Sequence, residues 1–145
     1  MGMTGSFERN LDAKGRLSLP ATLRSDLGEH VRVFKALDVD ALYVFSAEKF
    51  DLWVEGLFAG REGHEGFNSR DPKDQKLMRA INKRTTSIDV DSAGRIGLSE
   101  QLRAAAGLDR EVTLVGNYDH LEIWDRAVAE EDDASDDELA DLFFI

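Results

Sequence analysis

The chain repeats itself, and this internal repeat limits the possible folds more than any other feature. Residues 12–19 (DAKGRLSL) recur 79 positions later as residues 91–98 (DSAGRIGL), with the aspartate, the glycine, the arginine and two apolar positions in place. The match continues at the same spacing, with Leu23-Arg24 over Leu102-Arg103, Gly28 over Gly107, Val33 over Val112, Asp40 over Asp119, and Leu42, Val44 and Phe45 over Leu121, Ile123 and Trp124. We interpret the chain as two copies of a unit of about 45 residues, which is too small to fold stably alone.

Each copy begins with two short apolar segments on either side of a glycine-containing turn. These segments are residues 7–11 and 16–19 in copy one, and 87–90 and 95–98 in copy two. Alternating apolar residues around a tight turn predict a β-hairpin. Gly15 and Gly94 lie where such a turn takes a positive φ, which glycine adopts without steric cost.

A short helix and two further strands complete each copy. In copy one, Pro20 suits the first helical position and Gly28 is placed to end the helix. In copy two, Ser99 is a plausible N-cap. The strands expected afterwards are residues 31–36 and 41–45 in copy one, and 111–116 and 120–124 in copy two.

The region between the copies predicts two helices. Ser46 can cap the first, which carries a complete apolar stripe of Phe50, Trp53, Val54, Leu57 and Phe58. Such a stripe is typical of a core or a subunit interface. Residues 59–69 are rich in glycine and indicate a mobile loop. Asp71-Pro72 then starts a second helix, with Leu77, Met78 and Ile81 expected to face inward, and Asp125 can cap a shorter C-terminal helix.

The charge of the chain is unevenly distributed. With 29 acidic and 18 basic residues, the net charge of −11 argues at first against a nucleic-acid partner. Eight of the acidic residues lie in residues 130–145, which contain no basic residue. We expect a solvated, poorly ordered tail there, unless its apolar end docks on something. Residues 70–84 carry a net charge of +4, which we interpret as a solvated helix face.

Several function classes find no support in the sequence. The absence of cysteine excludes disulfides, thiolate nucleophiles and cysteine-ligated metals, and it favours a reducing cytoplasm. No apolar run is long enough to span a membrane, and no secretory signal is visible. His30, His64 and His120 lack metal-ligand spacing, and we expect them at the surface. Phosphate-binding glycine loops and nucleophile elbows are also missing, so we predict no enzyme activity, cofactor, metal or small-molecule substrate.

The repeated turn is the one feature that indicates a mechanism. Arg16 and Arg95 follow their turns at matching positions, so a symmetrical fold would present two guanidinium groups side by side. Arginine reads guanine O6 and N7 in the major groove with two hydrogen bonds. Asp12 and Asp91, four residues earlier, can hold each guanidinium in one orientation.

The two copies differ within this turn, and its role has two interpretations. Lys14 is placed to contact a phosphate, whereas copy two has Ala93 at that position. The alternative is that the aspartate–arginine pairs only stabilise their hairpins. Exposed pairs contribute about 0–1 kcal/mol, so stability alone gives little reason to repeat them.

Four segments together resemble the MraZ family of bacterial transcriptional regulators. They are residues 10–21 (NLDAKGRLSLPA), the DxxGR sequence of residues 91–95, residues 112–116 (VTLVG) and residues 122–125 (EIWD). The resemblance covers residues 6–128. It implies a mainly β fold with helices, in which two tandem AbrB-like swapped-hairpin half-barrels form one pseudo-twofold β-barrel, with helices between and after the copies.

The resemblance also implies a division of the chain. AbrB-like DNA-binding repeats are expected at residues 6–53 and 85–128. A connecting loop and basic helix at residues 54–84 separate them, and residues 129–145 form an acidic tail that the family pattern does not require.

The function implied by the resemblance is repression of transcription. Members form ring-shaped homo-oligomers that bind G-containing direct repeats in double-stranded promoter DNA of the division and cell-wall gene cluster, which places the protein in the cytoplasm at the nucleoid. The DNA-contacting residues carried over are Asp12, Lys14, Arg16, Asp91 and Arg95, with Arg9 and Arg24 as phosphate contacts. The alternative is an AbrB-like, antitoxin-like interaction module whose acidic tail binds a basic partner.

Overall fold

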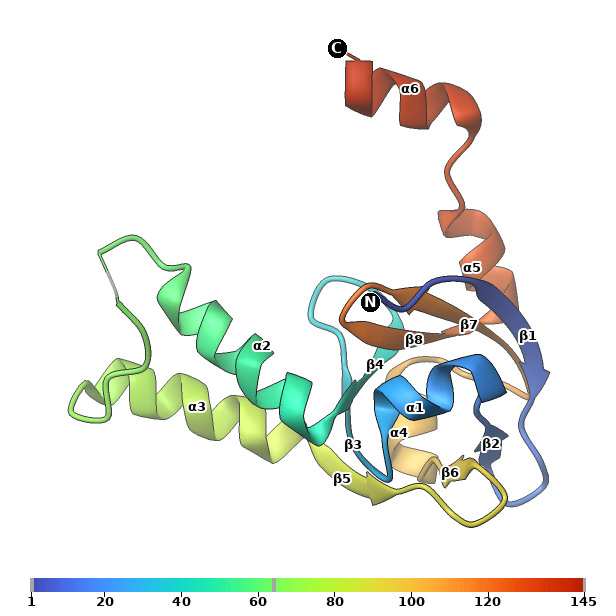
Figure 1. The fold of residues 1–145 in the computed structure, drawn as a ribbon, viewed down its shortest axis with the longest axis horizontal. Coiled ribbons are helices and arrows are strands. Elements are labelled where there is room, and N and C mark those ends of the chain that lie inside the picture. The colour runs from blue at the N-terminus through green and yellow to red at the C-terminus, as the bar shows by residue number, and fades with distance from the viewer. Residues whose placement is uncertain (1, 64, 145) are drawn as a thin grey trace.

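A computed structural model describes residues 2–63 and 65–144, and its two copies share one antiparallel sheet (Figure 1). Copy one contributes β1 (Ser6–Asn10), β2 (Arg16–Ser18), β3 (His30–Lys35) and β4 (Ala41–Ser46), and copy two contributes β5 (Thr86–Asp89), β6 (Arg95–Gly97), β7 (Glu111–Asn117) and β8 (His120–Asp125). Six strands form the sheet in the order β1-β7-β8-β4-β3-β5, while β2 and β6 form a separate ribbon. This mixture of strands and helices around a large antiparallel sheet agrees with the mainly β class predicted.

The first strand of each copy pairs with the other copy. β1 lies against β7, β5 lies against β3, and β2 pairs with β6. The predicted hairpins are therefore wrong as strand pairs, although their turns are correct: Gly15 and Gly94 both have a φ of 76°. The turns close through their own hydrogen bonds, such as the 3.1 Å bond from the Asp12 backbone N–H to the Arg16 carbonyl. The flanking strands satisfy their remaining backbone groups across the copies.

The strand register defines a local twofold axis. Residues at matching repeat positions face each other twice, Leu17 opposite Ile96 in the ribbon and Tyr43 opposite Glu122 in the sheet. A residue that faces its own counterpart lies on the axis relating the copies. We call the first pair the ribbon pole and the second pair the sheet pole.

One part of the repeat alignment needs correction. Arg9 faces Val112 in β7, and its counterpart Ile88 faces Val31 in β3, so Val112 corresponds to Val31 and not to Val33. By the pairing register, copy two has two more residues before β7 and two fewer between the paired ends of β7 and β8. A shift by two keeps every side chain on its own face of the sheet, so the apolar pattern alone does not reveal it.

Both copies build the main core. A 3-10 turn (Ala21–Leu23), α1 (Arg24–Leu27) and α4 (Glu100–Ala105) cover it. Its fully buried members from the strands and the ribbon include Leu17, Val31, Val33, Leu42, Val44, Ile96, Val112, Leu114, Leu121 and Ile123. Ser99 caps α4 as predicted, and its Oγ accepts a 3.1 Å hydrogen bond from the Leu102 N–H. Gly28 ends α1 with a φ of 73°.

A second, aromatic core carries a helical arm formed by α2 (Ala47–Ala59) and α3 (Pro72–Arg84). Figure 1 shows the arm projecting from the sheet. Ser46 and Asp71 cap the two helices as predicted. The buried members of this core are Phe34, Phe45, Phe50, Val54 and Phe58, with Met78 and Ile81 packed against them. Leu77, expected to face inward, is 44% exposed, because it lies at the open side of the arm.

The C-terminal tail is helical. α5 (Arg126–Asp132) follows Asp125, and α6 (Asp136–Phe144) begins after Ser135, whose Oγ accepts a 3.1 Å hydrogen bond from the Glu138 N–H. The structure has helices where a poorly ordered tail is expected from the charge, and α6 is exposed throughout, as expected for a solvated segment. Acidic residues in the first turn of α6 favour helix formation, because they oppose the positive end of the helix dipole. Among residues 2–63 and 65–144, no helix combines the length and apolarity needed to span a bilayer.

Candidate nucleic-acid interface

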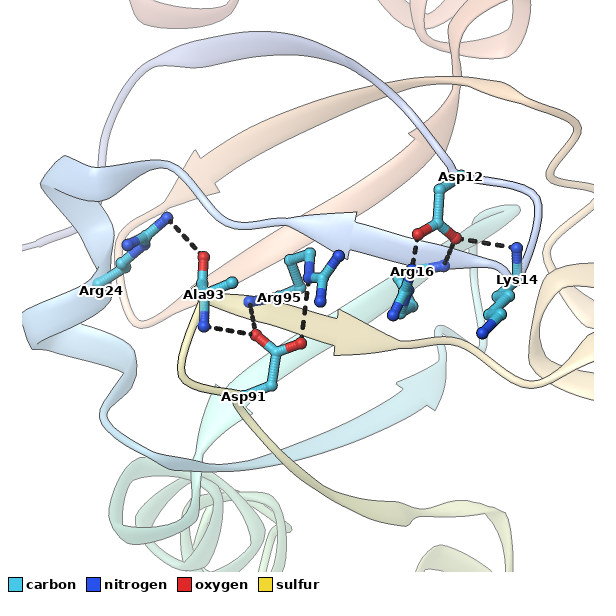
Figure 2. A network of polar contacts seen from close by, with 7 residues as sticks. All are labelled: Asp12, Lys14, Arg16, Arg24, Asp91, Ala93 and Arg95. Carbon is cyan, nitrogen blue, oxygen red and sulfur yellow. Dashed lines mark hydrogen bonds and ion pairs between the residues drawn. The ribbon is translucent and has the colours of Figure 1, made fainter.

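Each repeated turn folds around its aspartate (Figure 2). In loop 1 (residues 12–16), Asp12 Oδ1 accepts hydrogen bonds from the backbone N–H groups of Lys14, at 2.9 Å, and Arg16, at 2.8 Å. Asp12 Oδ2 accepts a 2.6 Å hydrogen bond from Nε of Arg16. A single side chain thus fixes the turn and the arginine that follows it.

Loop 2 (residues 91–95) repeats this arrangement. Asp91 Oδ1 accepts from the backbone N–H groups of Ala93 and Arg95, both at 2.9 Å. Asp91 Oδ2 accepts a 3.0 Å hydrogen bond from Nε of Arg95. The two loops therefore share one scaffold although two of the five residues differ.

The hydrogen bonds keep both aspartates ionised. The backbone N–H of Arg16, followed by its guanidinium, lowers the pKa of Asp12 to about 2. The backbone N–H of Arg95, assisted by its side chain, also lowers the pKa of Asp91. The four side chains are between 33% and 38% exposed, and pairs this exposed add little stability. Orientation of the arginines explains the arrangement better than stability does.

Each arginine keeps one edge of its guanidinium available. The aspartate engages Nε, and within the described part of the chain neither Nη1 nor Nη2 of Arg16 or Arg95 makes a hydrogen bond. Two adjacent N–H groups in a planar fork recognise a carboxylate, a phosphate or the Hoogsteen edge of guanine.

The ribbon directs both arginines to its outer face. Leu17 and Ile96 face each other and point into the core. Because side chains alternate along a strand, Arg16 and Arg95 project outward. Each arginine lies opposite a small residue, Gly97 for Arg16 and Ser18 for Arg95, as the ribbon register requires. Figure 2 shows the two loops at opposite ends of the ribbon.

Arg24 of copy one supports loop 2. Its Nε donates to the Leu19 carbonyl and its Nη2 donates to the Ala93 carbonyl, both at 3.3 Å. A Cβ at Gly94 would overlap this guanidinium. Arg24, predicted to contact phosphate, therefore lies against the backbone of the partner loop, and its contact with phosphate stays a prediction.

The counterpart Arg103 lies against Gly15 of loop 1, while its hydrogen bond stays within copy two. Its Nε donates to the Leu98 carbonyl at 3.2 Å, and a Cβ at Gly15 would lie 2.9 Å from that Nε. Sequence reasoning did not select Arg103 as a site residue, although the repeat match places it over Arg24. Each copy thus places an arginine against the loop of the other.

The two remaining site residues lie in different places. Lys14 is exposed in loop 1. Arg9 lies on β1, where its Nη1 donates to the Glu8 carbonyl at 2.9 Å and its guanidinium is 5.7 Å from the centre of the Phe7 ring. The structure therefore brings Asp12, Lys14 and Arg16 together in one loop and leaves Arg9 outside it.

The histidines differ from one another. His30 is exposed as predicted, with Nδ1 2.8 Å from Asp89. His120 is only 8% exposed, so its expected surface position is wrong. The reason is that both faces of β8 are covered at this point, with the rings of Tyr43 and Phe45 beside the imidazole. His64 lies outside the described residues.

His120 belongs to a buried polar network at the sheet pole. Glu122 Oε2 lies 2.8 Å from His120 Nε2 and accepts from Asn117, while Oε1 accepts from Trp124 Nε1. Burial would raise the pKa of Glu122, but these donors lower it. Burial would lower the pKa of His120, but the carboxylates of Glu122 and Asp119 raise it.

Tyr43 faces this network from copy one. Burial, followed by the charge of Glu122, raises the pKa of its hydroxyl to about 12. In residues 2–63 and 65–144, no three histidine, cysteine, aspartate or glutamate side chains are grouped so that they could hold a metal ion. The sheet-pole network is held together by its hydrogen bonds.

Comparison with known proteins places the chain among bacterial regulators. A family model described as "MraZ protein" and "antitoxin-like" matches residues 3–58 and 81–131. The transcriptional regulator MraZ of Corynebacterium jeikeium (strain K411) is 36% identical over 121 residues, which cover 83% of this chain and 79% of the relative. That of Corynebacterium urealyticum is 35% identical, with 88% and 83% covered. That of Nocardia farcinica is 34% identical, with 96% and 98% covered.

Proposed function

This chain belongs to the MraZ family of transcriptional regulators, and we propose that it regulates transcription by binding double-stranded DNA through loops 1 and 2. One observation carries the proposal. In each loop an aspartate holds Nε of an outward-facing arginine, and the Nη1 and Nη2 groups are left for a ligand.

The geometry suits recognition of guanine. A guanidinium fork that donates to O6 and N7 in the major groove discriminates by about 1–3 kcal/mol per base. Holding the arginine beforehand avoids part of the roughly 2 kcal/mol of rotamer entropy that a free side chain would lose. Lys14 adds a phosphate contact in loop 1, while Ala93 provides none in loop 2.

Two loops give one chain few base contacts, so we propose that specificity comes from assembly. A ring-shaped homo-oligomer engages several G-containing direct repeats at once, and each bound subunit raises the effective concentration of the next. The promoter of the division and cell-wall gene cluster is the proposed target and repression the proposed outcome, at the nucleoid. The exchange of β1 and β5 supports the swapped-hairpin half-barrels that the family resemblance implies.

An arginine substitution tests this function. Arg16→Ala removes one fork, and we expect specific affinity for the promoter repeats to fall about 10- to 100-fold, the range that follows from the lost base contact. Fluorescence anisotropy at fixed salt measures the affinity, and light scattering checks that the assembly is unchanged. Arg70→Ala, which removes an exposed arginine outside the loops, is the control. Unchanged specific binding by Arg16→Ala contradicts the proposal.

A second candidate function is an interaction module that captures a basic partner. It is favoured by α6, in which acidic and large apolar side chains are exposed together. Deletion of residues 130–145 distinguishes the two functions. Loss of partner capture with intact DNA binding supports the module, whereas loss of neither excludes a role for the tail in capture.

A further inference from the structure

The helical arm has an open apolar groove. It lies between α2, α3 and the end of β3 and has a volume of about 340 Å³. Phe34, Trp53 and Ile81 line it, and the partly exposed Leu57 and Leu77 lie on α2 and α3 at its sides. Large apolar side chains that remain exposed around a groove indicate a binding surface.

Cations surround this apolar groove. Lys35 and Arg84 line it directly. Lys73, Lys76 and Lys83 are exposed along one flank of α3 beside Leu77, because residues three and seven apart lie on the same side of a helix. An occupant that matches this surface is a helix with an apolar stripe and acidic flanks.

α6 has that composition. Leu139, Leu142 and Phe143 follow the spacing of one helical stripe and are 43%, 74% and 78% exposed. The rest of the helix carries Asp136, Asp137, Glu138 and Asp141. No residue of α6 is buried within its own chain. The helix therefore presents an unpartnered apolar stripe with negative charge beside it.

The topology separates α6 from the groove of its own chain. β4 and β8 are antiparallel, with Ala41 opposite Trp124, so α5 leaves the sheet where β4 begins. α2 starts after Ser46, at the other end of β4. Residues 133–135 between α5 and α6 span only about 10 Å even when extended. Figure 1 shows α6 beyond α5, projecting from the sheet in a different direction from the arm.

We infer that α6 of one copy docks in the groove of a second copy, with its apolar stripe in the groove and its acidic residues beside the α3 lysines. This inference rests on the proposed homo-oligomer and assigns the contact that builds it. The contact joins two different surfaces, so it repeats head to tail and closes into a ring when the rotation permits.

Cysteine crosslinking tests the inference, because the chain has no cysteine of its own. Full-length Leu142→Cys is mixed with full-length Leu57→Cys under mild oxidation, and disulfide-linked dimers are followed on a non-reducing gel. Leu52→Cys is the matched control, since Leu52 is exposed on α2 but does not line the groove. We expect the Leu57 pair to crosslink at least about tenfold faster, because a disulfide needs Cα atoms within about 7 Å. Equal rates overturn the inference.

A charge exchange tests the acidic flank separately. In the crosslinking pair, Lys73→Glu with Lys76→Glu on the groove side should slow the reaction by about tenfold, as like charges now face each other. Asp137→Lys with Asp141→Lys on the tail side should restore it. An unchanged rate overturns the proposed orientation.

Two further outcomes also overturn the inference. One is a disulfide formed within a single chain that carries both Leu142→Cys and Leu57→Cys, while the mixed variants give none. The other is a loss of DNA affinity on charge reversal of Lys73 and Lys76 with no inter-copy crosslink, which assigns the basic face to nucleic acid. Neither outcome touches the Arg16→Ala experiment, so failure of this contact and failure of the DNA-binding loops are distinguishable.

Discussion

At the ribbon pole, Leu17 faces Ile96, and both are fully buried aliphatic side chains that carry matching loops. At the sheet pole, Tyr43 faces Glu122, and the two copies have little chemistry in common. Copy one packs its aromatic cluster under the helical arm there, whereas copy two places a buried carboxylate among hydrogen-bond donors.

The comparison shows that the two copies have the same arrangement at their loops and a different one at the sheet pole. Both loops use an aspartate to hold Nε of an arginine, with distances of 2.6 and 3.0 Å. Each loop also has an arginine of the other copy against its glycine. Only copy one carries a long helical arm after its last strand, and the chemistry of the sheet pole follows from that difference.

The largest effect on stability should come from truncating the two buried side chains at the ribbon pole. Leu17→Ala and Ile96→Ala each remove a buried side chain on the axis, and we expect each to lower the free energy of unfolding by about 3 kcal/mol. Urea unfolding measures both. If the copies are equivalent here, the two losses agree within about 1 kcal/mol, the usual scatter between such sites. A clearly larger difference would break the symmetry assigned to this pole.

The supporting arginines should act across the copies. Arg24→Ala removes the donor to the Ala93 carbonyl, so we expect amide hydrogen exchange at Gly94 to become about tenfold faster while Gly15 is unchanged. Arg103→Ala should do the reverse. Exchange followed by NMR resolves the two glycines, and Arg110→Ala provides the control. Acceleration of both glycines by either substitution would mean that the loops are not supported separately.

Between about pH 6 and 9, where histidine titrates, the sheet pole should give a pH dependence of stability that the loops do not, because the loop aspartates titrate only at acid pH. The pKa of His120 is raised above 6.5, so its stabilisation is complete below about pH 6.5 and is lost as pH rises through the folded-state pKa. The pKa of Glu122 is lowered below 4.5, so its contribution is lost only as pH falls through that lower value. We expect the stability advantage of the wild type over His120→Phe to decline between pH 6 and 9 (a range set by the histidine pKa), as measured by urea unfolding. A constant advantage over that range would contradict the charged His120–Glu122 pair.

Lys14 should produce the smallest effect. Lys14→Ala removes one phosphate contact, which lowers the slope of log affinity against log salt by about 0.9 per contact. Ala93→Lys adds the contact in loop 2 and should raise the slope by the same amount. Anisotropy titrations between about 50 and 200 mM salt measure both variants. Equal slopes for all three proteins would show that residues 14 and 93 do not touch the backbone of the DNA.

Local signals predicted most of the elements. The Ser46, Asp71 and Ser99 caps, the positive φ of the two turn glycines and the strands were all readable, because each depends on residues within a few positions. The exchange of strands between copies could not be predicted from these local signals. A turn closed by Asp12 and Gly15 allows the following strand to pair with either neighbour, and long-range packing decides which.

The burial of His120 and the helix in the tail could not be predicted from the sequence, for different physical reasons. A lone histidine in a strand gives no sign that a carboxylate two residues later will be buried beside it, as Glu122 is beside His120. The tail's charge indicated disorder, although its apolar spacing was that of a helix. The repeat identified Asp12, Arg16, Asp91 and Arg95 as candidate site residues. Because the repeat also aligns Arg103 with Arg24, it was sufficient to identify Arg103 as well.

The strands that cross between the copies lie in one polypeptide, and this affects how the protein can evolve. An assembly of two identical subunits must carry every substitution at both symmetry-related positions. In this chain the two related positions are encoded separately, and residue 14 is lysine whereas residue 93 is alanine. If the loops bind DNA as proposed, a change in one loop leaves the other to keep its function while the first acquires a new preference.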